Sequence, residues 1–179
     1  MYARDAAADV AAALSQVTRS EIRLVKEEEV PADARAVIYV GEAARTASGA
    51  DLSGLRRGDW RVKAEPGKVY LLGRTMNAVN SAMVEFCERY CDYFFLTLDG
   101  DDPCVCKPGR TVPVCDVTVK PAIYCRSIYH GMWDGIRYPT TKKNWIRWSR
   151  LRRAEIPSTV EGRYRVSGQT RGCHSQFFY

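Results

Sequence analysis

The spacing of apolar side chains predicts two amphipathic helices in the first half of the chain. Asp5 is the expected N-cap of the first helix, and Asn77 is the expected N-cap of the second. The apolar positions of the first helix are Ala7, Val10, Ala11, Leu14 and Val17. Those of the second are Val79, Ala82, Met83, Phe86, Cys87 and Tyr90. The polar residues between them, including Asn80 and Ser81, are expected to face away from the core.

Alternation of apolar and polar residues predicts a β-hairpin over residues 60–72. Residues 60–64 alternate in character, and residues 68–72 form a second strand-like run. Between them, Glu65, Pro66 and Gly67 are typical turn residues. The hairpin is therefore expected to lead directly into the second helix.

Other apolar runs predict further strands in this region. Residues 36–40 are continuously apolar and stop at Gly41, a pattern typical of a buried central strand. Residues 21–25 and 93–96 predict two shorter strands. A stretch rich in Ala, Ser and Gly follows Gly41 as far as Leu55 and is expected to be a loop.

This order of elements predicts three parts of the chain. Residues 1–98 are expected to form an α/β domain in which two helices cover one face of a single mixed sheet. Residues 99–120 are rich in Asp, Gly, Pro and Cys and are expected to be a linker. Residues 121–179 have the pattern of a strand, a basic helix and a second strand.

The composition is that of a folded protein, and the charge divides it into two unequal regions. Of the 179 residues, 46% are hydrophobic and 27% are charged, which argues against disorder. Residues 1–102 carry 13 basic and 17 acidic side chains, whereas residues 103–179 carry 14 and 4. Such asymmetry is typical of a nucleic-acid-binding region, and equally of a basic segment separated from acidic neighbours in a longer protein.

The seven cysteines do not predict a disulfide framework, because an odd number cannot pair completely within one chain. Their spacing lacks the two close pairs that are typical of structural zinc. We therefore expect reduced thiols or small apolar core residues, no metal site and, as the preferred compartment, a reducing one such as the cytoplasm. The start of the chain lacks the pattern of a secretory signal, and no apolar run is long enough to cross a membrane.

Four segments, in this order, resemble the beginning of a group of glycoside hydrolases. They are Val37 to Gly41; Lys68 to Gly73 followed by Ala82 to Glu88; Val112-Pro113 followed by Pro121 to Arg126; and Gly172 to Ser175. The sequence resembles bacterial alpha-glucuronidases, beta-hexosaminidases and a related glycosidase-like family. In these enzymes a small α/β domain precedes a (β/α)-barrel.

The resemblance implies that residues 121–179 are the first strand–helix–strand of an incomplete barrel, since a whole barrel takes about 250 residues. Glycosidases of this kind work with paired carboxylates. Among the few acids of this segment, Glu155 lies at a predicted helix end and Glu161 in a loop, and neither ends a strand. We therefore expect the catalytic acids beyond Tyr179 and expect this chain alone to be inactive. The expected partners are a carbohydrate and the remainder of the barrel, with no cofactor.

The resemblance also implies a set of sugar-binding residues. Arg126 lies in the segment that resembles the first barrel strand, where a guanidinium would bind hydroxyl or carboxylate oxygens of the sugar. His130 and Trp133 lie in the loop that follows, and His174 follows the second predicted strand. For each residue, a structural role in the barrel is the alternative.

Residues 142–153 support a different function. They interleave six basic side chains with Trp145 and Trp148, a composition suited to phosphates and stacked bases. The interpretation we favour is an outer barrel helix with solvated charges, so nucleic acid is the less favoured partner. A nucleic-acid-binding protein and a non-catalytic interaction module remain the alternatives to a carbohydrate-processing enzyme.

Overall fold

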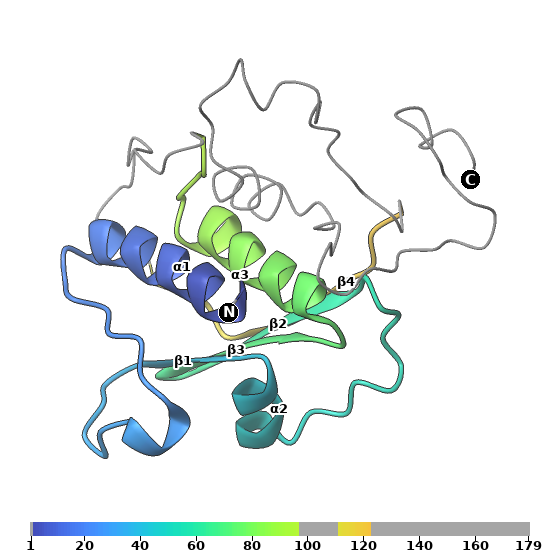
Figure 1. Ribbon diagram of the computed structural model, residues 1–179, viewed down its shortest axis with the longest axis horizontal. Coiled ribbons are helices and arrows are strands. Elements are labelled where there is room, and N and C mark those ends of the chain that lie inside the picture. The colour runs from blue at the N-terminus through green and yellow to red at the C-terminus, as the bar shows by residue number, and fades with distance from the viewer. Residues whose placement is uncertain (1, 97–110, 123–179) are drawn as a thin grey trace, which may run out of the picture.

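A computed structural model of the chain describes residues 2–96 and 111–122 (Figure 1). Within these residues, three α-helices accompany one four-stranded sheet with the strand order β1-β3-β2-β4. The strands are β1 (Val37–Val40), β2 (Trp60–Glu65), β3 (Lys68–Gly73) and β4 (Cys115–Val119). β1 runs parallel to β3, and β2 runs antiparallel to both β3 and β4. The expected mixed-sheet α/β fold is thus confirmed for this part of the chain.

Two long helices cover one face of the sheet, as the apolar patterns predict. These are α1 (Tyr2–Thr18) and α3 (Met76–Tyr90), which lie side by side over the strands (Figure 1). The core beneath them combines alternate side chains of the strands with the apolar stripes of both helices. Its buried members include Val10, Leu14, Trp60, Val62, Leu71, Val79, Met83 and Phe86.

The beginnings of both helices differ from the sequence expectation. α1 begins at Tyr2, so Asp5 lies in its first turn, where a carboxylate interacts favourably with the helix dipole. The N-cap of α3 is Thr75, whose Oγ1 accepts a hydrogen bond from the Ala78 backbone N–H at 3.2 Å. Asn77 lies within the helix because α3 begins one residue earlier, at Met76.

The buried side of α3 is wider than its apolar stripe. Asn80 and Ser81 were expected to face away from the core, but both are buried, as is Val84. The reason is that α3 packs against α1 as well as against β2 and β3. Ser81 is accommodated because its hydroxyl donates to the Asn77 carbonyl oxygen at 3.0 Å, within the helix itself.

A third, short helix covers part of the opposite face of the sheet, where the sequence predicts only a loop. This is α2 (Glu42–Ser48), below the strands in Figure 1. Gly41, with a φ of 64°, precedes the helix, and Gly49 caps its C-terminal end in the left-handed conformation. Ala44 is fully buried against Tyr70 and Leu72 of β3, so packing on the sheet stabilises this helix.

β1 is an edge strand, and the expectation of a central strand for residues 36–40 is therefore wrong. Its residues are only partly buried, and β3 is its strand partner. Ile38 and Val40 pack toward the α1–α3 layer, whereas Tyr39 packs toward α2. Because both faces of this edge strand contact helices, its sequence is as continuously apolar as that of a central strand.

The two shorter predicted strands are absent from the described sheet. In the segment after α1, the Ile22 backbone N–H donates to the Ser15 hydroxyl at 3.0 Å, so Ile22 packs against α1 instead of joining a strand. A short 3₁₀ helix, η1 (Glu27–Glu29), follows. In residues 93–96 the burial alternates, with Tyr93 and Phe95 in the core, but the segment is not part of the sheet.

The sheet continues beyond residue 98 in a range where the sequence predicts a linker. β4 (Cys115–Val119) pairs with β2 in a register that joins Trp60 to Val119 and Ala64 to Cys115. The elements expected within residues 123–179 lie outside the described residues. No helix in the described part of the chain is both long and apolar enough to span a bilayer.

Candidate functional site

The residues that the sequence singles out for sugar binding cannot be placed. Arg126, His130, Trp133 and His174 all lie outside residues 2–96 and 111–122, as does the basic segment 142–153. The best-defined group of polar side chains in the described part of the chain lies on the sheet, on the face that α2 partly covers.

The strand register places four side chains in one row across the whole sheet. Tyr39 of β1 is paired with Tyr70 of β3, Tyr70 with Lys63 of β2, and Lys63 with Asp116 of β4. Successive residues of a strand point to opposite faces, so this row shares the face opposite to the α1–α3 layer. We call these four residues the cross-strand row.

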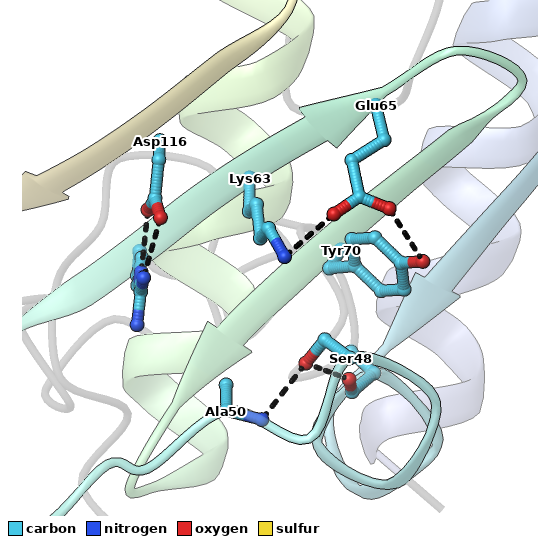
Figure 2. A network of polar contacts seen from close by, with 8 residues as sticks. Ser48, Ala50, Lys63, Glu65, Tyr70 and Asp116 are labelled. Atoms are coloured by element: carbon cyan, nitrogen blue, oxygen red, sulfur yellow. Dashed lines mark hydrogen bonds and ion pairs between the residues drawn. The ribbon is translucent and has the colours of Figure 1, made fainter.

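The aromatic end of the row is packed and the charged end is accessible. The Tyr39 and Tyr70 rings are stacked, with centroids 5.5 Å apart and planes 10° apart. Both contact the apolar cluster under α2. α2 is held to the following loop by Ser48, whose hydroxyl donates to the Ala44 carbonyl oxygen at 2.6 Å and accepts from the Ala50 N–H at 3.3 Å (Figure 2).

Lys63, Glu65 and Tyr70 form one group of contacts beside α2 (Figure 2). The Lys63 Nζ lies 2.6 Å from the Glu65 Oε1, and the Tyr70 hydroxyl donates to the Glu65 Oε2 at 3.3 Å. The same Lys63 Nζ lies 5.5 Å from the centroid of the Tyr70 ring, within the range of a cation–π interaction. Each oxygen of the Glu65 carboxylate thus has its own donor.

A second ion pair joins β2 to β4. The Arg61 Nε and Nη2 donate to the two carboxylate oxygens of Asp116, which lies 55 residues further along the chain. This is the bidentate geometry that a planar guanidinium favours. The Arg61 side chain is 26% exposed and that of Asp116 is 43% exposed, so the pair is accessible to solvent.

The charges of this face are stabilised by one another. The hydrogen bond from Arg61 lowers the pKa of the Asp116 carboxyl, and the hydrogen bond from Lys63 lowers the pKa of the Glu65 carboxyl. Reciprocally, Glu65 raises the pKa of Lys63 and Asp116 raises that of Arg61. All four groups are therefore ionised at neutral pH.

Tyr70 also remains protonated. Burial is the main cause that raises the pKa of its hydroxyl, and the negative charge of Glu65 acts in the same direction. A general acid or base needs a pKa near the working pH, and these shifts move each group away from neutrality. The face therefore suits the binding of a polar or charged surface, and it does not suit proton transfer.

No group of three or more potential metal ligands occurs in the described part of the chain. Three cysteines lie there, and none of the three is in a disulfide. Cys87 of α3 and Cys91, the C-cap of the same helix, are buried in the core, while the Cys115 Sγ lies 3.5 Å from the Tyr90 hydroxyl. These thiols have the character of small core residues.

Part of this face was visible in the sequence. The alternation in residues 60–64 places Arg61 and Lys63 on one side of a strand, opposite to Trp60 and Val62. Asp116 was not expected to join them, because its segment was assigned to a linker. The available signal in the sequence was the alternation of apolar and polar residues over 115–119.

Comparison with known proteins gives no match to this chain among protein-family models, curated proteins or solved structures.

Proposed function

We propose that this chain is the accessory N-terminal part of a carbohydrate-processing enzyme, a glycoside hydrolase acting on glucuronide- or hexosaminide-like substrates. Residues 1–98, joined in the sheet by β4, form the accessory α/β domain, and residues from Pro121 on begin the catalytic (β/α)-barrel. The catalytic carboxylates lie in the complete protein, beyond Tyr179. The chain by itself is inactive.

The ionisation of the polar sheet face supports one part of this proposal, namely that the chain is inactive by itself. A glycosidase needs one carboxyl group that keeps its proton at the working pH, so that it can protonate the leaving group. The interactions of Glu65 and Asp116 lower both pKa values and so do the opposite. A domain with this face has a supporting or binding role in the enzyme. The hydrolytic groups belong to another part of the protein.

Two further features support the proposal. The mixed sheet with two helices on one face is the fold that the resemblance implies for an accessory domain that precedes a barrel. The last strand of the sheet ends at Val119, two residues before the Pro121 to Arg126 segment that resembles the first barrel strand. The proposed domain boundary therefore coincides with the end of a strand.

The test compares the complete protein with the 179-residue chain on aryl glycosides, including aryl glucuronides and aryl N-acetylhexosaminides. The complete protein is expected to hydrolyse one class of substrate, and the chain is expected to hydrolyse none. Hydrolysis by the isolated chain that persists through purification would contradict the proposal. If the complete protein hydrolyses none of these glycosides and the chain binds a random oligonucleotide in a salt-dependent manner, the result favours the nucleic-acid-binding alternative instead.

Arg126 provides a sharper test in the complete protein. Loss of a charge-assisted contact to the sugar costs about 2 kcal/mol, so Arg126→Ala is expected to lower kcat/KM by roughly 30-fold. Arg45→Ala is the matched control, because Arg45 is half exposed on α2 and pairs with Glu42. An unchanged kcat/KM in a folded Arg126→Ala protein would remove this residue from the sugar site.

A further inference from the structure

Three segments that are distant in the sequence meet at one end of the sheet. They are the turn before β2, the connection from β3 to α3, and the end of β4. The Arg74 Nη1 donates to the Leu55 carbonyl oxygen at 3.0 Å, and the Thr75 hydroxyl donates to the Arg57 carbonyl oxygen at 2.9 Å. The turn before β2 is thereby bound to the start of α3.

A buried carboxylate organises this turn. The Asp59 residue has 0% of its surface exposed. Its Oδ2 accepts from the Arg56 backbone N–H at 2.9 Å, and its Oδ1 accepts from the Arg56 Nε at 3.0 Å. The Asp59 N–H in turn donates to the Arg56 carbonyl oxygen at 3.1 Å. The charge of a buried carboxylate is thus matched by a guanidinium held in one position.

The same guanidinium reaches the end of the described sheet. The Arg56 Nη2 lies 2.9 Å from the Asp59 Oδ1 and donates to the Pro121 carbonyl oxygen at 3.2 Å. The strand register places Trp60, the residue after Asp59, opposite Val119, the last residue of β4. Arg56 therefore spans from a buried anchor to the backbone two residues past the sheet.

We propose that Asp59 and Arg56 are positioning residues that fix the direction in which the chain leaves β4. We call the contact from Asp59 through Arg56 to the Pro121 carbonyl the Arg56 bridge. Sheet pairing ends at Val119, and the bridge extends the ordered path through Lys120 to Pro121. Pro121 supplies a rigid φ angle at the point where the bridge holds it.

The consequence for the whole protein rests on the proposed function. If residues from Pro121 on begin the catalytic barrel, the Arg56 bridge sets the orientation of the accessory domain relative to the barrel. A flexible exit would let the two domains move independently, which is the default for domains with a small interface. The bridge itself can be tested without any substrate.

The test is backbone ¹⁵N relaxation of the full 179-residue chain. In the unaltered chain, the amides of Lys120 and Ala122 are expected to have order parameters close to the rigid value of about 0.85. In Arg56→Gln they are expected to fall below about 0.6, while the amides of Val62 and Leu71 keep their values. A change in overall stability alone would not produce this local pattern.

Two further variants separate the bridge from the ion pair. Arg56→Lys keeps a positive charge that pairs with Asp59, but it lacks the planar guanidinium that contacts Asp59 and the Pro121 carbonyl together. The mobility of Ala122 is therefore expected to rise while the ion pair with Asp59 remains. Arg45→Gln is the matched control, because Arg45 also pairs with an acid three residues away, Glu42, and lies far from Pro121 in sequence. It is expected to leave Lys120 and Ala122 unchanged.

The outcomes are decisive in either direction. A folded Arg56→Gln chain with unchanged order parameters at Lys120 and Ala122 would overturn the inference, as would an equal fall across β2 and β3. The Arg56 side chain is 52% exposed, so the Arg56→Gln chain is expected to fold. The test therefore remains valid even if substitution of the buried Asp59 prevents folding. A failure of the glycosidase assays would leave the relaxation result, and so the bridge, unaffected.

Discussion

Gly73 lies so close to the first turn of α3 that a Cβ atom on it would be 2.6 Å from the Ala78 Cβ. Gly73 ends β3 and is paired with Trp60 of β2, so the strand cannot move away without disturbing the hairpin. The Val79 backbone nitrogen, at 2.7 Å from the same position, is equally fixed. A glycine here lets the strand turn directly into the helix.

Gly73→Ala is therefore expected to destabilise the protein by about 2–3 kcal/mol, the scale of overpacking a site whose neighbours are backbone atoms. The measurement is the urea concentration at the midpoint of unfolding, with the slope unchanged. Gly54→Ala is the control, because a Cβ at Gly54 has no atom within 4 Å and its backbone is not left-handed. Equal stability of the two variants would contradict the close approach of Gly73 to the first turn of α3.

Arg19 follows the end of α1 with a φ of 53°, a conformation that costs residues with a Cβ about 1 kcal/mol. Arg19→Gly is expected to raise the free energy of unfolding by up to about 1 kcal/mol, because glycine adopts this conformation freely. Arg19→Ala keeps the Cβ and should not show the gain. If thermal unfolding shows Arg19→Gly to be the less stable of the two variants, the left-handed conformation of Arg19 is wrong.

Thr75 serves two segments with a single hydroxyl. It accepts the hydrogen bond of the Ala78 N–H at the start of α3 and donates its own to the Arg57 carbonyl oxygen. Thr75→Ala is expected to lose about 1–2 kcal/mol of stability, the cost of removing an N-cap. Thr75→Ser retains the hydroxyl and should lose little. Equal losses in chemical denaturation would show that the methyl group, and not the cap, matters.

The acid stability of the domain is expected to depend on Asp59. Burial is the largest influence on the Asp59 pKa and raises it, but the hydrogen bonds and charge of Arg56, with a contribution from Lys120, outweigh it and leave the pKa below the usual value of an aspartate. As the pH falls below that value, the unfolded chain binds a proton that the folded protein does not. The stabilisation is thus present above about pH 4 and is lost as the pH falls through the folded pKa.

The measurement is the free energy of unfolding as a function of pH between about 2 and 6. Asp59→Asn removes the group, so its curve is expected to be flatter in the acid range, whatever its stability at neutral pH. Asp51→Asn is a comparison, because hydrogen bonds from Ser53 lower the pKa of Asp51 at an exposed position. Parallel curves for Asp59→Asn and the unaltered chain would contradict the prediction.

The Arg61–Asp116 pair is expected to contribute little to stability in spite of its bidentate geometry. Both side chains are partly exposed, and solvent screens such pairs to about 0.5–1 kcal/mol. A double-mutant cycle of Arg61→Ala and Asp116→Ala should give this coupling at low salt and less at about 1 M salt. A coupling that is large and independent of salt would mean that the pair is desolvated in solution.

The sequence alone determined the elements whose pattern and contacts are local. The hairpin of residues 60–72 was predicted because its turn residues and its alternation lie within one short segment, and its partners are sequence neighbours. The stripe of α3 was predicted because helical spacing puts apolar residues on one side wherever the helix packs. Two helices on one face followed from these stripes.

Tertiary structure decided what depends on partners far away in the chain. The burial of Asn80 and Ser81 depends on α1 lying beside α3, and the edge position of β1 depends on which strand pairs with β3. The cross-strand row and the Arg61–Asp116 pair depend on the register of β4, in which Asp116 lies 55 residues after Arg61. A local pattern specifies which side of a strand a residue occupies, but only the pairing of distant strands specifies the residue that faces it.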